Sequence, residues 1–261
     1  MTMKIACSDY DGTLFREDTI SKDDVDGVHV WREHGHKFGP VSGRDLGMLT
    51  PQLRHYGIEF DFAVCNNGAI ICDKDGEVLY EGQIKPEILK KVSEEPCVQA
   101  SFHFAFSAKD RTYLCHESEG SWIMREGKEW DFPVIYIEEK DILTLPQIHQ
   151  FSLGFEEPRD SAAAADVLNA KYGAYLHAYP NRCSLDITPP GISKSSGIGH
   201  LKQLMNWPDA EVYVIGDEVN DLPMLEAYQK HAYVVDTARD VIKKKAAAVY
   251  AGVGAMLVAN A

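Results

Sequence analysis

The 261-residue sequence predicts an α/β fold, in which a doubly wound core with a parallel sheet is interrupted by an inserted α+β domain. Short apolar runs, such as residues 5–8 and 211–215, lead into acidic side chains and then into segments with helical patterning. This order of elements is typical of parallel strands joined by helices. Between residues 83 and 187 several strands follow one another with helices interleaved, which indicates a separate α+β module.

The composition indicates a globular protein without a membrane span. Hydrophobic residues make up 45% of the chain and charged residues 25%, and there is no apolar run of about 18 residues. We expect a cytoplasmic protein, because the N-terminus leads into a strand and lacks a signal-peptide pattern. The net charge of -14 argues against nucleic acid as a partner, since such binding depends on Lys and Arg. A phosphate-handling site would need a metal ion and a few local cations.

The six cysteines form no C-x-x-C pair, and several lie within apolar runs. We therefore expect free thiols, and neither a disulfide framework nor a zinc site.

The first predicted strand, residues 5–8, leads into two carboxylates, Asp9 and Asp11, and a turn at Gly12. Carboxylates at the carboxyl end of a parallel strand lie where open α/β sheets bind ligands. Because two acids there would repel each other, we expect a hard cation, and Mg²⁺ suits carboxylates, waters and substrate phosphate. A calcium loop is excluded, because the twelfth residue from Asp9 is Ile20 and not glutamate.

A helix is predicted over residues 22–34, with Ser21 as its cap and Gly35 as its stop. The next core strand is predicted over residues 36–41. Pro40 is unfavourable in a central strand, because proline cannot donate to the hydrogen-bond ladder.

Ser42 and Gly43 follow that strand, and residues 44–56 have the pattern of a helix. Two roles are open for Ser42. Its hydroxyl can cap the helix, and it can also help to hold a phosphoryl group, since helix N-termini bind anions.

A third strand, residues 62–65, ends in the turn Asn66-Asn67-Gly68. Residues 70–72 and 78–80 are then expected to form a hairpin.

The inserted segment alternates helices and strands. Phe102, Phe104 and Phe106 fall on one strand face, which favours core packing over substrate stacking. The last two strands are expected to form a hairpin around Pro180-Asn181, and Arg182 near its tip is a candidate substrate contact. Helices are predicted over residues 86–95, 121–130 and 158–172, and strands over residues 99–106, 112–115, 134–137, 148–155, 174–179 and 183–187.

Lys194 lies in the first turn of a helix that is expected to end near residue 205. A lysine there opposes the helix dipole and calls for a compensating anion, although a solvated surface lysine is the alternative. The buried strand over residues 211–215 leads into Asp217, Asn220 and Asp221, which repeats the geometry proposed for the first strand. The core is then completed by strands over residues 231–235 and 248–250 and helices over residues 222–228, 238–245 and the C-terminus.

Four motifs in this order resemble those of the haloacid dehalogenase superfamily. The turn Asn67-Gly68-Ala69 and the long insertion are similar to the Cof-type branch, whose members carry a C2-type cap. The resemblance implies a Rossmann-like core formed by residues 1–82 and 188–261, and a cap domain over residues 83–187 that covers the site and selects the substrate. The motifs are Asp9-Tyr10-Asp11-Gly12-Thr13-Leu14, Ser42, Lys194, and Gly216-Asp217 with Asn220-Asp221.

By that resemblance Asp9 is the nucleophile that forms an aspartyl-phosphate, and Asp11 protonates the leaving oxygen and later deprotonates water. Mg²⁺ is implied at Asp9, the carbonyl of Asp11, and Asp217, with Lys194 neutralising the phosphoryl charge and Asp221 in support. The residues expected to contact the phosphoryl group or the substrate are Gly12, Ser42, Gly43, Arg44, Asn220 and Arg182.

The expected function is a Mg²⁺-dependent phosphatase that hydrolyses a small organic phosphomonoester, with a sugar phosphate as the usual substrate of such relatives. Asp11 favours phosphoryl transfer over carbon–halogen cleavage, because dehalogenase relatives lack a second acid there. Two alternatives are a phosphotransferase or mutase that passes the phosphate to another sugar, and a non-catalytic sensor of a phosphate ligand. A small phosphorylated molecule is the expected partner, and the protein is expected to be a monomer or a homodimer.

Overall fold

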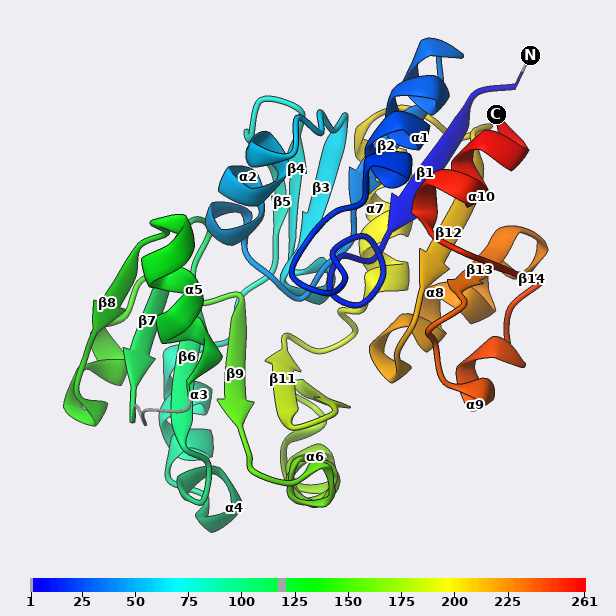
Figure 1. The fold of residues 1–261 in the computed structure, drawn as a ribbon. Helices are drawn as coiled ribbons and strands as arrows, with labels where there is room; N and C mark the ends of the chain where they lie inside the picture. Colours follow the sequence, from blue (N-terminus) through cyan, green and yellow to red (C-terminus); the bar gives the residue numbers. More distant parts are fainter. Residues whose placement is uncertain (1, 117–120) are drawn as a thin grey trace. The chain divides into compact units, whose positions relative to one another are not determined.

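The computed structural model describes residues 2–116 and 121–261, which divide into two compact units (Figure 1). The first comprises residues up to Ser42 together with Leu53–Tyr80 and Ser193–Ala261. The second comprises Gly43–Gln52 and Glu81–Ile192. The sequence did not indicate that residues 43–52 group with the second unit.

The first unit is built on a five-stranded sheet in the order β14-β13-β12-β1-β2, and every neighbouring pair is parallel (Figure 1). This confirms the predicted parallel α/β core. The strands are β1 (Lys4–Ser8), β2 (Lys37–Pro40), β12 (Glu211–Gly216), β13 (Ala232–Val235) and β14 (Ala248–Tyr250).

Helices cover both faces of this sheet, as expected for a doubly wound fold. Ile5 and Cys7 of β1 point into an apolar core shared with α7 and α8, whereas Ala6 between them lies on the opposite face. Trp31 of α1 packs edge-on against Tyr213 of β12, and α1 lies along α10. The helices of this unit are α1 (Lys22–Glu33), α7 (Lys194–Leu204), α8 (Leu222–Ala227), α9 (Asp240–Lys243) and α10 (Val253–Asn260), with short 3-10 turns η3 (Val219–Asp221) and η4 (Gln229–His231). Helix α2 (Leu46–His55) belongs to the second unit up to Gln52 and to the first from Leu53.

Strand β2 forms despite Pro40, because β2 is the last strand of this five-stranded sheet and the proline nitrogen faces away from its partner β1. Pro40 lies opposite Ser8 of β1, and the next N–H, that of Val41, donates to the Ser8 carbonyl at 2.7 Å. Since successive backbone groups alternate sides, the nitrogen of Pro40 points away from β1 and no hydrogen bond to β1 is lost.

A three-stranded sheet in the order β3-β4-β5 completes the first unit. Its first strand is joined to the end of β2 by a parallel bridge between Val41 and Val64. The elements are β3 (Phe62–Cys65), η1 (Asn66–Gly68), β4 (Ile70–Asp73) and β5 (Val78–Glu81).

The second unit contains a six-stranded sheet in the order β10-β11-β9-β6-β7-β8, antiparallel except for the β7–β8 pair. Phe104 and Phe106 are fully buried against Phe151 in its apolar core, which confirms their packing role. The strands are β6 (His103–Ser107), β7 (Thr112–Cys115), β8 (Val134–Tyr136), β9 (Gln150–Gly154), β10 (His177–Asn181) and β11 (Ser184–Thr188), and the helices are α3 (Pro86–Ser93), α4 (Pro96–Gln99), α5 (Trp122–Trp130), α6 (Pro158–Tyr172) and η2 (Glu139–Thr144).

Two sequence predictions in this unit were wrong in detail. The strand predicted over residues 99–106 begins only at His103, because Pro96 starts a short helix, a position that proline favours. The hairpin predicted around Pro180-Asn181 turns one step later, at Arg182 and Cys183, and Pro180 is tolerated within β10 because that strand is at the sheet edge.

All six cysteines are free thiols. None of the helices in the described parts of the chain combines the length and the hydropathy that crossing a membrane requires.

Candidate active site

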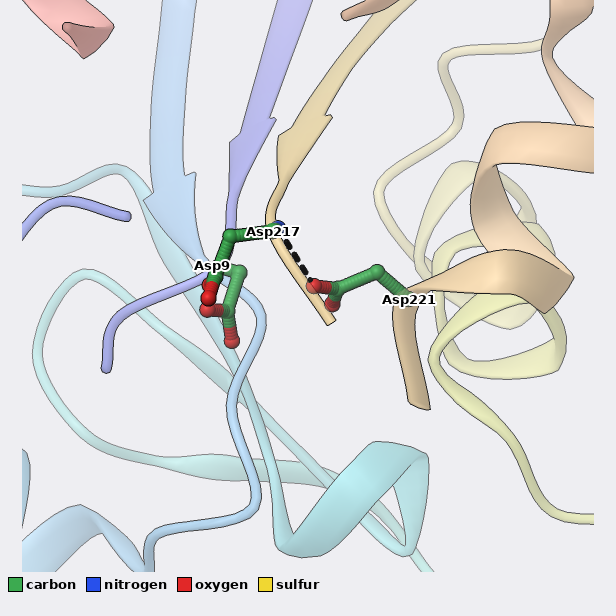
Figure 2. A group of neighbouring side chains, drawn as sticks. All are labelled: Asp9, Asp217 and Asp221. Carbon is green, nitrogen blue, oxygen red and sulfur yellow. Dashed lines mark hydrogen bonds between the residues drawn. The ribbon is translucent and has the colours of Figure 1, made fainter. Parts of the chain in front are cut away.

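Three buried carboxylates converge where two central strands end. Asp9 follows β1 and Asp217 follows β12, and these strands are paired so that Ser8 lies opposite Ile215. The side chains of Asp9 and Asp217 lie side by side, with Asp221 next to them at the start of the following helical segment (Figure 2). One carboxylate oxygen from each of the three residues lies within 4.8 Å of the other two. The parallel register therefore brings together residues more than 200 positions apart in the chain.

Lys194 provides the balancing charge. It is the first residue of α7, whose cap is the Ser193 hydroxyl, and its side chain is fully buried. Its ammonium group donates to Asp9 Oδ1 at 2.5 Å and to Asp221 Oδ1 at 2.6 Å. This confirms the prediction that Lys194 faces an anion, and Lys194 is not a solvated surface lysine.

The electrostatics of this group are dominated by burial. Burial raises the pKa of the Asp9 carboxyl well above its ordinary value, and the carboxylates of Asp221 and Asp217 add to that rise while Lys194 opposes it. Burial alone would lower the pKa of Lys194, but Asp221 and Asp9 outweigh it and raise the pKa overall. The lysine is therefore a fixed positive charge.

Asp221 links the lysine to the backbone of the neighbouring loop. Its Oδ2 accepts the N–H of Asp217 at 2.9 Å and that of Glu218 at 3.0 Å, while Oδ1 accepts from Lys194. A carboxylate that already accepts three hydrogen bonds is better suited to fixing Lys194 and Asp217 than to binding a cation directly.

Two residues of the first motif have contacts that sequence reasoning missed. Thr13 is fully buried, and its hydroxyl donates to Asp217 Oδ1 at 2.8 Å. Gly12 has φ +85°, and a Cβ at that position would lie 2.6 Å from Asp217 Oδ2. Gly12 is thus required by the close approach of Asp217. The only signal in the sequence was that both residues lie beside the two acids of the motif.

Asp11 is exposed, in contrast to Asp9, and does not belong to the three-carboxylate group. It lies in a tight turn in which the N–H groups of Leu14 and Phe15 donate to the Tyr10 carbonyl at 3.0 and 2.8 Å. The bend after Asp9 therefore separates the environments of the two acids.

Ser42 is buried at the end of the segment that follows β2. Its N–H donates to the Val64 carbonyl at 2.9 Å, and its carbonyl accepts from the Asn67 N–H at 2.8 Å. The backbone of β3 and of the turn that follows it therefore fixes the N–H and the carbonyl of Ser42.

Three predicted contact residues belong to the second unit. The Gly43 carbonyl accepts from Gln150 Nε2 at 2.9 Å. Arg44 is buried and forms a two-pronged ion pair with Glu126 of α5, with 2.8 Å between Nη2 and Oε1. Arg182 occupies the β10–β11 turn with φ 51°. Of the remaining predicted residues, Asn220 is buried within η3 of the first unit.

The donor set fits a hard divalent cation. Mg²⁺ binds to oxygen ligands, and typically to one or two carboxylates with the remaining positions taken by water and phosphate. Asp9 and Asp217 provide such oxygens, and three clustered acids with a single lysine leave an excess of negative charge. The described residues around this group include no cysteine or histidine ligand that would favour a softer metal.

Comparisons with known proteins show the family of the chain and similar folds. The family of haloacid dehalogenase-like hydrolases matches residues 6–253 of the chain. A structure of a haloacid dehalogenase-like hydrolase from B. subtilis superposes with a TM-score of 0.85 at 18% identity, covering 99% of this chain and 100% of that one. The HAD subclass IIB sugar phosphatase BT4131 superposes with a TM-score of 0.75 at 19% identity, covering 98% and 97%.

A curated relative is the 5-amino-6-(5-phospho-D-ribitylamino)uracil phosphatase YbjI of Escherichia coli, which is 21% identical over 228 residues, covering 86% of this chain and 82% of the relative. The chain therefore belongs to the haloacid dehalogenase-like hydrolases. Within that family it is a Cof-type enzyme of the phosphatase class.

Proposed function

We propose that the protein is a Mg²⁺-dependent phosphomonoesterase that hydrolyses a small sugar phosphate through an aspartyl-phosphate on Asp9. The observation that carries the proposal is the buried Asp9 carboxylate, held at 2.5 Å from Lys194 beside Asp217. A carboxylate fixed at one oxygen keeps the other available in a defined direction, which is what a nucleophile requires.

In the first step an Asp9 oxygen attacks phosphorus, the bond from phosphorus to the ester oxygen breaks, and Asp11 gives its proton to the leaving oxygen. In the second step a water attacks phosphorus, Asp11 takes the proton of that water, and the bond to Asp9 breaks. The exposure of Asp11 suits this exchange, because an accessible acid can reach both the leaving oxygen and water.

The remaining residues of the site would bind the phosphoryl oxygens or the metal ion. Lys194 and the hydroxyl of Ser42 would bind phosphoryl oxygens, while Asp221 keeps Lys194 in place. Asp9 and Asp217, with the carbonyl of Asp11, would hold the metal ion. When bound, Mg²⁺ would supply positive charge that keeps Asp9 ionised and offsets the charge on the phosphoryl oxygens.

A sugar phosphate is the proposed substrate class because the superposable BT4131 is a sugar phosphatase. The phosphoribityl compound in the name of YbjI is likewise a phosphorylated polyol derivative.

The test is phosphate release from p-nitrophenyl phosphate and a panel of sugar and cofactor phosphates, with Mg²⁺ and with EDTA. We expect turnover that requires the metal, is lost in Asp9→Asn, and is unchanged in Asp75→Asn, which removes an exposed acid on the β4–β5 turn. Turnover that survives EDTA or Asp9→Asn would contradict the proposal. A preference for non-sugar esters would overturn the substrate class alone.

A further inference from the structure

Asn66 has an unusual environment in the first unit. It follows β3 directly, is fully buried, and neither atom of its carboxamide has a hydrogen-bond partner among residues 2–116 and 121–261. Within those residues it is the only side chain with two polar atoms in that condition. Buried amide groups are normally paired, so such an exception calls for an explanation.

The backbone at this position is also unfavourable. Asn66, Asn67 and Gly68 have φ values of 51°, 53° and 106°, which places three consecutive residues in the left-handed region. Asparagine enters this region more easily than most residues, but usually as a single residue. Unfavourable backbone that the surroundings enforce is concentrated at ligand sites.

Two contacts fix this turn between parts of the proposed phosphoryl site. On one side the Asn67 N–H donates to the Ser42 carbonyl at 2.8 Å. On the other side Gly68 lies against Ser193, since a Cβ on Gly68 would be 2.3 Å from the Ser193 carbonyl oxygen. Ser193 caps the helix that begins with Lys194. Along the chain, Asn66 is therefore next to Asn67, which contacts Ser42. It is two positions before Gly68, which lies against the residue preceding Lys194.

We propose that Asn66 is a further substrate-binding residue, whose carboxamide donates a hydrogen bond from Nδ2 to an oxygen of the bound phosphoryl group. This inference rests on the proposed function, since it assumes a phosphoryl ligand beside Ser42 and Lys194. A neutral amide suits the position, because it adds a donor to an anion without adding a charge to a group of three acids and a lysine. The unpaired amide and the left-handed turn are then explained together, as groups kept ready for the ligand.

The test compares Asn66→Gly with Asn206→Gly. Asn206 has φ 54° but is exposed on the loop after α7, so the control relieves the same backbone conformation without removing a buried amide. In each protein the affinity for inorganic phosphate is measured by calorimetry with Mg²⁺ present, together with KM for p-nitrophenyl phosphate and Tm.

For Asn66→Gly we expect the dissociation constant for phosphate and the KM each to rise about tenfold or more, because a hydrogen bond to a charged group is lost. Its Tm should stay the same or rise, because an unpaired buried amide and backbone strain are both removed. Asn206→Gly should bind phosphate as the wild type does. Unchanged phosphate affinity in Asn66→Gly would overturn the proposal.

A second measurement does not depend on that variant. In the wild type, the ¹⁵N resonance of the Asn66 carboxamide should move when phosphate and Mg²⁺ are added, whereas that of Asn206 should not. A stationary Asn66 resonance at saturating phosphate would overturn the inference even if the enzyme is active. Failure of the proposed function would be seen separately, as absence of Mg²⁺-dependent turnover in the wild type.

Discussion

The ammonium group of Lys194 donates to Asp9 Oδ1 at 2.5 Å, and both side chains are buried. The two residues are 185 positions apart in the chain and belong to different elements, the start of α7 and the end of β1. Without the lysine, Asp9, Asp217 and Asp221 would form a buried group of like charges. The contact therefore both stabilises the folded site and holds the proposed nucleophile in place.

Replacing Lys194 should lower both the stability of the protein and its turnover. We expect Lys194→Met to lower the free energy of unfolding by about 3 kcal/mol or more, because removing one partner of a buried ion pair leaves uncompensated charge. Added Mg²⁺ should restore part of the loss, and phosphatase turnover should be abolished. Lys230→Met removes a lysine from a loose surface pair with Glu211 and should change neither quantity. Chemical denaturation with and without Mg²⁺ measures the effect, and equal stability of Lys194→Met and wild type would contradict it.

The hydroxyl of Thr13 should control metal affinity through Asp217. Thr13→Val removes the 2.8 Å hydrogen bond to Asp217 Oδ1 while keeping the shape of the side chain. Loss of such an outer contact typically weakens metal binding by about 10–100-fold. Thr13→Ser should restore the affinity, since it keeps the hydroxyl. Calorimetric titration with Mg²⁺ is the measurement, and a valine variant that binds Mg²⁺ as the wild type does would show that the contact has no role in binding.

A side chain at Gly12 should disturb the same carboxylate by direct collision. In Gly12→Ala the Cβ would lie 2.6 Å from Asp217 Oδ2, so Asp217 must move. Gly57→Ala is the matched control, because φ is +69° there and nothing lies within 4 Å of an added Cβ. Both variants should lose about 1–2 kcal/mol of stability from the left-handed backbone, but only Gly12→Ala should also lose Mg²⁺ affinity and turnover. Equal metal binding by the two variants would contradict this.

Asp45 should make the stability of the second unit depend measurably on pH. Burial raises the pKa of this fully buried carboxyl from 3.8 to about 6, although the N–H of Met48 and the hydroxyl of Thr112 donate to it. Because the folded state binds the proton more tightly, stability is highest below about pH 4 and falls as the pH rises towards 6. At 1.36 kcal/mol per pH unit, ionisation of the buried Asp45 lowers the free energy of unfolding by about 3 kcal/mol at neutral pH.

Asp45→Asn cannot lose a proton, so this contribution disappears. The stability of the variant relative to the wild type should therefore rise by about 2–3 kcal/mol between pH 4 and pH 7. Urea unfolding at a series of pH values gives the comparison. A difference between the two proteins that does not change with pH would contradict the buried, raised pKa.

The parts of the fold that the sequence predicted well have strong local signals. The strand at Phe62–Cys65 and the helix at Pro158–Tyr172 match the prediction residue for residue, because an apolar β-rich run and a proline-led alanine-rich segment leave few alternatives. Ser21 also caps α1 as expected, accepting the Asp24 N–H. The short helix α4 was missed because four residues are too few for helical periodicity to appear.

For the site, the sequence identified Asp9, Asp217, Asp221 and Lys194, which the structure brings together. It did not indicate the contact of Thr13 with Asp217 or the pairing of Arg44 with Glu126, which join residues 204 and 82 positions apart. Such contacts depend on strand register and helix packing, and neither is encoded in the spacing of any single motif.

The central claim, that Asp9 becomes phosphorylated, is tested most directly in the Asp11→Asn variant mixed with p-nitrophenyl phosphate. Since p-nitrophenolate leaves without needing a proton, the first step should proceed while the hydrolysis that requires a base stalls. Quenching in acid and measuring the intact mass should show a gain of one phosphoryl group, located at Asp9 by peptide mapping and absent when Asp9→Asn is added. A protein that releases p-nitrophenol without that mass gain, or that keeps the gain in the double variant, would contradict the assignment of Asp9 as the nucleophile.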